Sequence, residues 1–291
     1  MPNWLCRLLR IPAFFCRFFW RRHVMIACYH SIDSRRFEAH VEVLQRRYNL
    51  ISLDTLVTGL ERRDWGLIPD WAMVITFDDG AKDFYELRDV LQRRRVPVTH
   101  YLVSSLLGTH RHFWFKEAAD ADSLKQLPED ARAEHLARQR GHSAQREYET
   151  RQALSLEEAR ELMAVGTVFG AHTATHPILP QCPDEAAWEE IRGCKRELED
   201  KLGVPVHHFS YPNGDCCLRD EQIVRKAGFR SARLVELGTN GIRTDPFRLK
   251  IVDVLEDRSA ADLELIDLRL AWYAIRGRLG LGRSKQRKKN G

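Results

Sequence analysis

Two carboxylates stand side by side directly after an apolar run that is typical of a buried β-strand. The run covers residues 71–77, and Asp78 and Asp79 follow it immediately before Gly80. Reactive groups gather at the carboxyl ends of strands in parallel βα architectures. Adjacent residues point in different directions there, so one carboxylate could bind a metal ion while its neighbour faces a substrate. The alternative interpretation is a turn with a helix-capping aspartate, which the same three residues also suit.

Two histidines follow another strand-like run, residues 167–171. His172 and His176 are four positions apart, so they lie on one helical face or within one tight loop, close enough to share an ion. Imidazole nitrogen suits Zn²⁺ and its transition-metal neighbours. With Asp79 as a third ligand, the set would leave positions open for water and substrate, as in catalytic zinc sites. An ordinary surface loop is the alternative for two histidines at this spacing.

Two weaker candidates also stand at the ends of expected strands. Residues 209–214 lead from a strand into a turn that could expose backbone N–H groups to a developing oxyanion, although any strand-to-loop turn looks similar. The turn residues are Tyr211, Pro212, Asn213 and Gly214. His30 ends the first apolar run, and the unperturbed pKa of histidine, about 6.5, suits proton donation near neutrality. Taken alone, His30 is equally interpreted as a structural histidine.

The elements that must position these groups alternate between strand and helix. Apolar runs predict strands at residues 24–29, 71–77, 98–103, 167–171, 206–211 and 229–235. Three- and four-residue spacing predicts helices at 37–44, 83–95, 155–165, 184–202 and 219–227. This alternation indicates a parallel sheet or barrel covered by helices. Residues 109–153 are polar and helix-forming without a strand signal, and we interpret them as an insertion.

Length and composition indicate an ordinary globular protein. The chain has 291 residues, of which 44% are hydrophobic and 30% charged, which excludes wholesale disorder. No run approaches the roughly 18 apolar residues that a membrane-spanning helix needs. The seven cysteines are odd in number, scattered and never spaced as CxxC. This pattern favours reduced thiols, and with them a cytoplasmic location.

The net charge of +5 comes from the two ends of the chain. Residues 1–22 carry five arginines and no acid, and residues 276–291 carry seven Lys/Arg and no acid, while the body between them is net acidic. We therefore expect no nucleic-acid groove across the body. If residues 1–22 form a helix, their arginines fall within one arc of its surface and aromatic residues occupy the rest. This pattern resembles an interfacial helix on an anionic membrane. A helix packed against the body and a disordered leader are the alternatives.

Three further expectations concern these ends. The basic tail, 276–291, is expected to be disordered and solvated, with contact to anionic lipid as the second interpretation. No small-residue cleavage site follows the first segment, so a cleavable signal peptide is not expected. Together, these features predict a cytoplasmic protein that is peripheral at the inner face of the membrane, with residues 23–275 as its one folded domain.

The combined motifs resemble the polysaccharide deacetylases that contain a NodB homology domain, carbohydrate esterase family 4. Residues 76–80 (Thr-Phe-Asp-Asp-Gly) and 172–176 (His-Thr-Ala-Thr-His) are similar to the first two motifs of that family without a mismatch, and 209–214 resembles the third. The resemblance extends over about residues 23–255. It implies a distorted (β/α) barrel of about seven parallel strands, with the insertion at about 109–153.

The resemblance also implies a role for each residue. Asp78 would be the general base, while Asp79, His172 and His176 would hold a divalent metal, Zn²⁺ in the first place with Co²⁺ or Ni²⁺ as alternatives. A backbone N–H near Asn213 would stabilise the oxyanion. The family's third motif usually has an arginine that orients the base, whereas this chain has Ser210 at that place.

The second departure concerns the proton donor. The usual late histidine is missing, because no histidine follows His208. The chain resembles instead the circularly permuted branch exemplified by deacetylases of poly-β-1,6-N-acetylglucosamine, in which a front Tyr-His pair supplies the acid. Tyr29 and His30 fit that arrangement, so His30 becomes the expected general acid.

The expected function is metal-dependent removal of N-acetyl groups from N-acetylhexosamine units of a polysaccharide or its lipid-linked precursor. Two alternatives remain open at this point. One is a carbohydrate-binding or polysaccharide-assembly protein that keeps the fold with little turnover, which Ser210 would favour. The other is a metal-dependent amidase or esterase that acts on a small molecule.

Overall fold

The structure is a computed structural model of the chain, and it describes residue 18 and residues 21–118 and 121–266. The predicted interfacial segment therefore lies almost entirely outside the described residues, and the basic tail lies wholly outside them. Both remain predictions. Among the described residues, no helix has the length and apolar character needed to cross a membrane.

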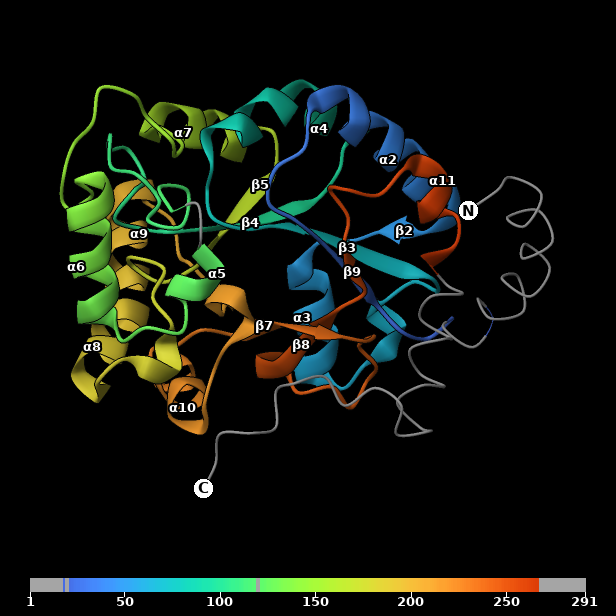
Figure 1. Ribbon diagram of the computed structural model, residues 1–291. Coiled ribbons are helices and arrows are strands. Elements are labelled where there is room, and N and C mark those ends of the chain that lie inside the picture. Colours follow the sequence, from blue (N-terminus) through green and yellow to red (C-terminus); the bar gives the residue numbers. More distant parts are fainter. Residues whose placement is uncertain (1–17, 19–20, 119–120, 267–291) are drawn as a thin grey trace.

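A parallel sheet forms the centre of the molecule (Figure 1). Its strands run in the order β8-β7-β6-β5-β4-β3-β1-β9, and β2 pairs with the start of β3. The bounds are β1 Met25–Tyr29, β2 Asn49–Leu50, β3 Ala72–Phe77, β4 Val98–Leu102, β5 Thr167–Ala171, β6 His208–Ser210, β7 Ser231–Leu237, β8 Leu249–Ile251 and β9 Asp253–Val254. This confirms the predicted α/β fold, with more strands than the seven expected.

The sheet closes into a barrel through residues 249–255. Only Val252 separates β8, which pairs with β7, from β9, which pairs with β1. The backbone N–H of Val252 donates to the carbonyl of Ile26, and that of Leu255 donates to the carbonyl of Cys28. The expectation of a front strand in a permuted barrel agrees with the position of β1 between β3 and β9.

Helices surround the barrel, with α2, α4 and α7 along the top of Figure 1 and α8 and α9 at the left. Their bounds are α2 Ser34–Arg47, α3 Leu53–Arg62, α4 Arg88–Arg94, α5 Ala121–Leu124, α6 Glu129–Arg140, α7 Leu156–Ala164, α8 Asp184–Trp188, α9 Cys194–Leu202, α10 Leu218–Lys226 and α11 Ala260–Leu263. Helix α7 begins at the predicted capping box, in which Ser155 and Glu158 each accept a backbone hydrogen bond from the other.

Two local expectations need correction. The helix expected over 184–202 is interrupted by a π-helical turn at Glu189–Gly193, and the one expected over 83–95 begins as a 3₁₀ helix at Lys82–Leu87. Helix α3 and the strands after residue 248 were not predicted. Strands β8 (Leu-Lys-Ile) and β9 (Asp-Val) are short and each contains a charged residue, so no apolar run indicates them.

Side chains of β1 alternate between two apolar clusters. Met25, Ala27 and Tyr29 pack in the large core beneath α2, whereas Val24, Ile26 and Cys28 belong to the cluster that includes α3 and Tyr101. This period-2 alternation places Cys28 on the opposite face of β1 from Tyr29. The insertion contains α5 and α6 and no strand among its described residues, as expected.

Candidate active site

Three strand-end side chains converge as potential metal ligands. Asp79 follows β3, while His172 and His176 follow β5, and one donor atom of each lies within 4.8 Å of the other two. The Nε2 atoms of both histidines are 3.6 Å from Oδ1 of Asp79. Zinc–nitrogen and zinc–oxygen bonds of about 2.1 Å at a tetrahedral angle would place such atoms about 3.4 Å apart. The donor set therefore fits a divalent ion with only a small adjustment.

The protonation of these groups also suits a cation. Nδ1 of His172 lies 2.7 Å from the carbonyl oxygen of Ser210, and donation to this acceptor leaves the Nε2 lone pair facing Asp79. Burial holds the pKa of His176 well below its usual value, so this imidazole is neutral. Burial also raises the pKa of Asp79, because its charged form is poorly solvated. A bound cation would supply the positive charge that this buried carboxylate needs.

The backbone at the ligands adopts an uncommon conformation. Asp79, Thr173 and His176 have positive φ angles of 74°, 65° and 63°. Asp and His tolerate the left-handed region better than most residues, whereas a β-branched threonine there is a genuine outlier. The Thr173 hydroxyl accepts a hydrogen bond from the backbone N–H of His176 at 3.0 Å. Strain of this kind persists only where the surroundings impose it, and it clusters at functional sites.

Glu190 supports the histidine loop from outside the barrel. Its carboxylate accepts hydrogen bonds from the backbone N–H of Thr175 at 2.9 Å and from the Thr175 hydroxyl at 2.7 Å. Its backbone carbonyl accepts a third from the N–H of Ala174 at 3.0 Å. Glu190 lies in the π-helical turn, and such turns are frequent at functional sites. The break in the predicted helix thus turns a carboxylate toward the loop between the two histidines.

We expect Glu190→Ala to weaken metal binding by about 10–100-fold, the usual effect of removing a group that orients ligands. Glu190→Gln keeps a side-chain oxygen that can accept from the Thr175 hydroxyl. Its affinity for Zn²⁺ should therefore lie between those of Glu190→Ala and the wild type. Glu189→Ala is the matched control, because Glu189 is exposed in the same turn. Equilibrium dialysis against Zn²⁺ measures the affinities. Equal affinities for the Glu190→Ala and Glu189→Ala proteins would contradict the assignment.

Asp78 is held by an arginine that the sequence analysis did not identify. Arg233 on β7 forms an ion pair with Oδ2 of Asp78 and donates to the Ser210 hydroxyl at 2.8 Å. Burial alone raises the pKa of Asp78, but the Arg233 guanidinium outweighs it and holds the pKa well below its usual range. Ser210 and Arg233 are register partners on adjacent strands. The arginine expected at position 210 is therefore provided from the neighbouring strand.

A signal for Arg233 was present in the sequence. It interrupts an apolar strand whose neighbours Ala232 and Leu234 pack in the core, and its own side chain is fully buried. A charged residue in the middle of an apolar strand requires a buried partner of opposite charge. What the sequence could not reveal is that this partner is Asp78, 155 residues away.

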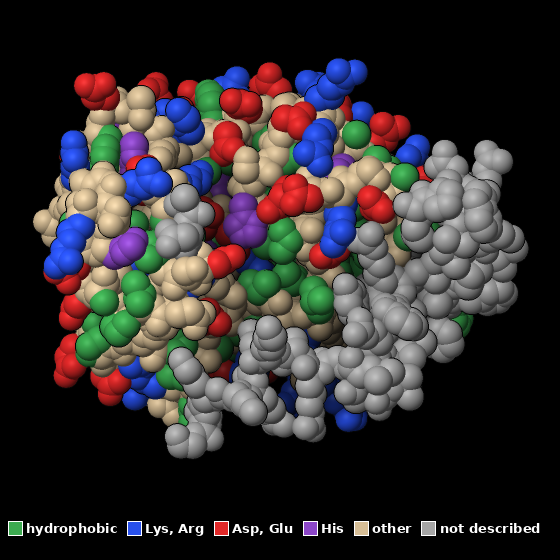
Figure 2. Space-filling model, viewed as in Figure 1, with side chains coloured by type: hydrophobic (Ala, Val, Ile, Leu, Met, Phe, Trp, Pro, Cys, Tyr) green, Lys and Arg blue, Asp and Glu red, His purple; other side chains and the backbone are tan. Residues whose placement is uncertain are grey.

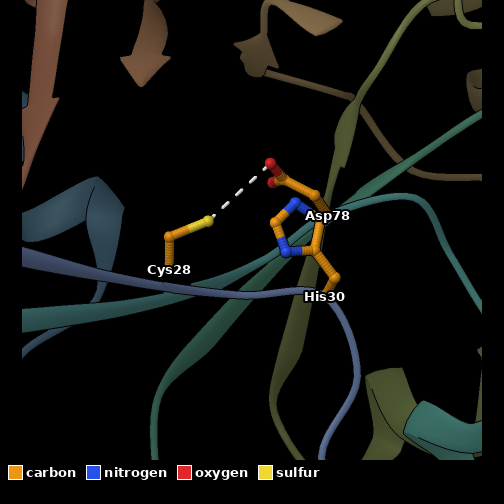
Figure 3. Close-up of side chains that lie close together, drawn as sticks. All are labelled: Cys28, His30 and Asp78. Atoms are coloured by element: carbon orange, nitrogen blue, oxygen red, sulfur yellow. Dashed lines mark hydrogen bonds between the residues drawn. The ribbon is translucent and has the colours of Figure 1, made fainter. Parts of the chain in front are cut away.

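His30 follows β1 and lies beside Asp78 (Figure 3). Its Nδ1 is 2.9 Å from Oε1 of Glu256, the residue two positions after β9, and its backbone N–H donates to the same carboxylate at 3.2 Å. Burial alone lowers the pKa of His30, but Glu256 and the two neighbouring aspartates outweigh it and raise the pKa to about 9. His30 therefore carries its proton at neutral pH, with Nε2 free to donate it.

Glu256 should set the pH range in which His30 holds that proton. A group with a raised pKa is protonated below it and loses its proton as pH rises through it, so activity is expected to fall on the alkaline side, at or below about pH 9. Glu256→Gln removes the charge but keeps a hydrogen-bond acceptor, and it should move the alkaline limb of the kcat profile to lower pH. An unchanged limb in this variant would exclude Glu256 from this role.

The side chains of the candidate active site differ in their exposure to solvent. Asp78, Asp79, His172 and His176 are buried, whereas the His30 side chain is 43% exposed. Of the five side chains, His30 is therefore the one that solvent contacts most. The face drawn in Figure 2 has acidic and basic side chains interspersed, with histidine and apolar side chains near its centre.

The predicted oxyanion turn forms a 3₁₀ turn at Pro212–Gly214 after β6. The N–H of Tyr211 donates to the Arg233 carbonyl, and that of Gly214 donates to the Tyr211 carbonyl. Proline has no N–H, so Asn213 holds the remaining backbone donor of the turn. Asn213 has a φ of 55°, which asparagine tolerates. Of the four residues predicted, Asn213 thus remains the candidate donor, and its role toward an oxyanion stays a prediction.

Comparison with known proteins shows the family and the fold of the chain. The sequence matches the polysaccharide deacetylase family over residues 69–232, more than half of the chain. No curated protein gives a significant match. The structure of IcaB from Ammonifex degensii is 19% identical, with a TM-score of 0.63 over 84% of this chain and 97% of that one.

Two further structures are similar. Streptococcus pyogenes deacetylase PplD, solved with acetate, is 16% identical with a TM-score of 0.61 over 82% of this chain and 95% of that one. A de-N-acetylase from Aggregatibacter actinomycetemcomitans is 14% identical with a TM-score of 0.60 over 84% of this chain and 99% of that one. At these identities the likeness shows a shared fold. By its sequence match, its motifs and its barrel, the chain belongs to the polysaccharide deacetylase family, the NodB-type carbohydrate esterases of family 4.

Proposed function

We propose that the protein removes N-acetyl groups from N-acetylhexosamine units of a polysaccharide or its lipid-linked precursor and that it requires a divalent metal ion, Zn²⁺ in the first place. The observation that carries this proposal is the position of Asp78. It stands next to the three-donor set, is ion-paired with Arg233 and faces His30. A proton acceptor, a proton donor and a cation site thus lie together at the carboxyl ends of β1, β3 and β5.

Asp79, His172 and His176 would hold the ion. When bound, the ion supplies Lewis acidity toward the acetamide carbonyl and lowers the pKa of water toward about 7. Asp78, kept ionised by Arg233, accepts the proton of the attacking water. The N–H of Asn213 then donates to the oxygen of the tetrahedral intermediate.

His30 completes the reaction by protonating the leaving nitrogen. Amide hydrolysis depends on this step, because an amide anion is a poor leaving group. Glu256 keeps His30 protonated and oriented, so that Nε2 is the donating atom. The products are acetate and a free amino sugar. Before the next turnover Asp78 loses the proton that it accepted and His30 takes up one proton, so both groups return to their starting states, and the proton of the acetic acid is released to solvent.

The binding-protein alternative depended on the missing arginine at position 210. Arg233 contacts the Asp78 carboxylate that this arginine would orient, so Ser210 no longer favours an inactive protein. Acetate release from N-acetylglucosamine oligomers tests the proposal, with Asp78→Asn as the inactive control. Equal release by the two proteins would contradict it. A panel of short acetamides distinguishes the small-molecule amidase, which would hydrolyse them faster than the oligomers.

A further inference from the structure

A second group of metal-ligating side chains lies beside the first. Sγ of Cys28, a ring nitrogen of His30 and a carboxylate oxygen of Asp78 all lie within 4.8 Å of one another (Figure 3). Cys28 is on β1 and is fully buried, and its Sγ is 3.8 Å from Oδ2 of Asp78. The reaction proposed above uses His30 and Asp78 but gives no role to Cys28.

The distances suit a tetrahedral ion. Zinc–sulfur and zinc–oxygen bonds of about 2.3 and 2.1 Å at a tetrahedral angle would place sulfur and oxygen about 3.6 Å apart. The observed separation between Sγ and Oδ2 of Asp78 is 3.8 Å, and Oδ2 is also the oxygen of the ion pair with Arg233. Nδ1 of His30 is engaged by Glu256, so Nε2 remains as the ligand atom. Oδ1 of Asp78 is buried and has no hydrogen-bond partner among the described residues, which leaves it free to bind an ion.

The charges around this group allow one divalent cation. A Cys28 thiolate and the Asp78 carboxylate supply two negative charges at the ion, and Glu256 behind His30 supplies a third. Arg233 contributes one positive charge through its ion pair with Asp78. One dication therefore brings the cluster to neutrality. A thiolate and an imidazole select soft or borderline ions such as Zn²⁺ and Cd²⁺ over Mn²⁺ and Mg²⁺.

We propose that Cys28, His30 and Asp78 bind a second, thiophilic divalent cation that inhibits the enzyme. Binding replaces the proton on the Cys28 sulfur and the proton on Nε2 of His30, and both protons are released to solvent. The binding claim is independent of the reaction, whereas the inhibition rests on the proposed function. An ion on His30 and Asp78 occupies the atoms that donate and accept protons, so substrate hydrolysis stops while the first ion stays in place.

The consequence is a metal dependence that differs between ions. Activity should rise as Zn²⁺ fills the Asp79, His172 and His176 site and fall again at higher Zn²⁺ as the second site fills. With Mn²⁺ the activity should rise without the fall, because Mn²⁺ binds thiolate poorly.

The test compares the wild type with Cys28→Ser, and with Cys182→Ser as the matched control. Cys182 is also a buried free thiol, and its Sγ donates to the carbonyl of Ile178. Equilibrium dialysis against Zn²⁺ should give two ions per chain for the wild type and for Cys182→Ser, and one for Cys28→Ser. Zinc inhibition should disappear only in Cys28→Ser. One ion on the wild type, or two on Cys28→Ser, would overturn the proposal.

Cobalt titration of the wild type provides a readout that needs neither a variant nor a substrate. A thiolate-to-cobalt charge-transfer band should appear with the second equivalent of Co²⁺ and not with the first, because the first site contains no sulfur. If no band appears, Cys28 does not bind the ion. If two ions bind, the charge-transfer band appears and no oligomer is deacetylated, then the proposed function is wrong and the second metal site is confirmed.

Discussion

His30→Ala is expected to lower kcat on N-acetylglucosamine oligomers by about 10²–10⁴-fold, the usual contribution of acid–base catalysis. The ion bound by Asp79, His172 and His176 should remain, because His30 is not one of its ligands. His30 stands beside Asp78 with its proton held by Glu256, so its loss leaves the departing amine unprotonated. Steady-state rates together with bound-metal analysis measure the two quantities.

Changing the leaving group of the substrate gives a second test of His30 as the proton donor. An aryl acetate releases a stable anion that needs little protonation, so His30→Ala should lose much less activity on such an ester than on the amide. His207→Ala is the matched control, since His207 lies just before β6 and outside the cluster of Figure 3. An unchanged amide rate, or an equal loss on amide and ester, would remove His30 as the proton donor.

Arg233→Met is expected to have the second large effect, on both activity and stability. It leaves Asp78 as a buried charge without its partner, a change that costs about 3–5 kcal/mol of unfolding free energy. Asp78 then becomes a poorly oriented base whose pKa rises, because burial is no longer opposed by the guanidinium. The acidic limb of the kcat profile should therefore move to higher pH. Denaturant titration and rate profiles measure the two effects.

Exchanging Ser210 and Arg233 tests whether the arginine must come from β7 or can act from β6. Ser210 and Arg233 are register partners, and the family usually has its arginine at the position of Ser210. The Ser210→Arg/Arg233→Ser protein should therefore recover part of the activity that Arg233→Ser loses. If the exchange recovers nothing and Arg233→Met retains the wild-type rate and pH profile, Arg233 does not orient the base.

Much of the centre could be predicted because its residues come in short motifs at strand ends. Asp78 and Asp79 follow β3, and His172 and His176 follow β5, and the carboxyl ends of parallel strands meet at one end of a barrel. The apolar runs also indicated six of the strands, namely β1, β3, β4, β5, β6 and β7. Local sequence is sufficient to predict a site residue wherever its motif directly follows the strand that positions it.

The supporting residues could not be found in this way, because each acts across a large separation. Arg233 reaches Asp78 over 155 positions, and Glu256 reaches His30 over 226. No spacing rule connects such pairs, and only the barrel brings them together. Glu190 was missed for a different reason. It lies only 15 positions from Thr175, but the residue pattern predicted an unbroken helix over 184–202 and did not indicate the π-helical turn that contains Glu190.

A crystal structure of the zinc-loaded protein, with the ion located by anomalous scattering, would show whether Asp79, His172 and His176 bind the metal. We expect an ion bound by Oδ1 of Asp79 and by Nε2 of His172 and His176 at about 2.0–2.2 Å. The Asp78 carboxylate should lie beside the ion without being one of its ligands. An ion bound elsewhere in the chain, or one at this place without either histidine, would contradict the account.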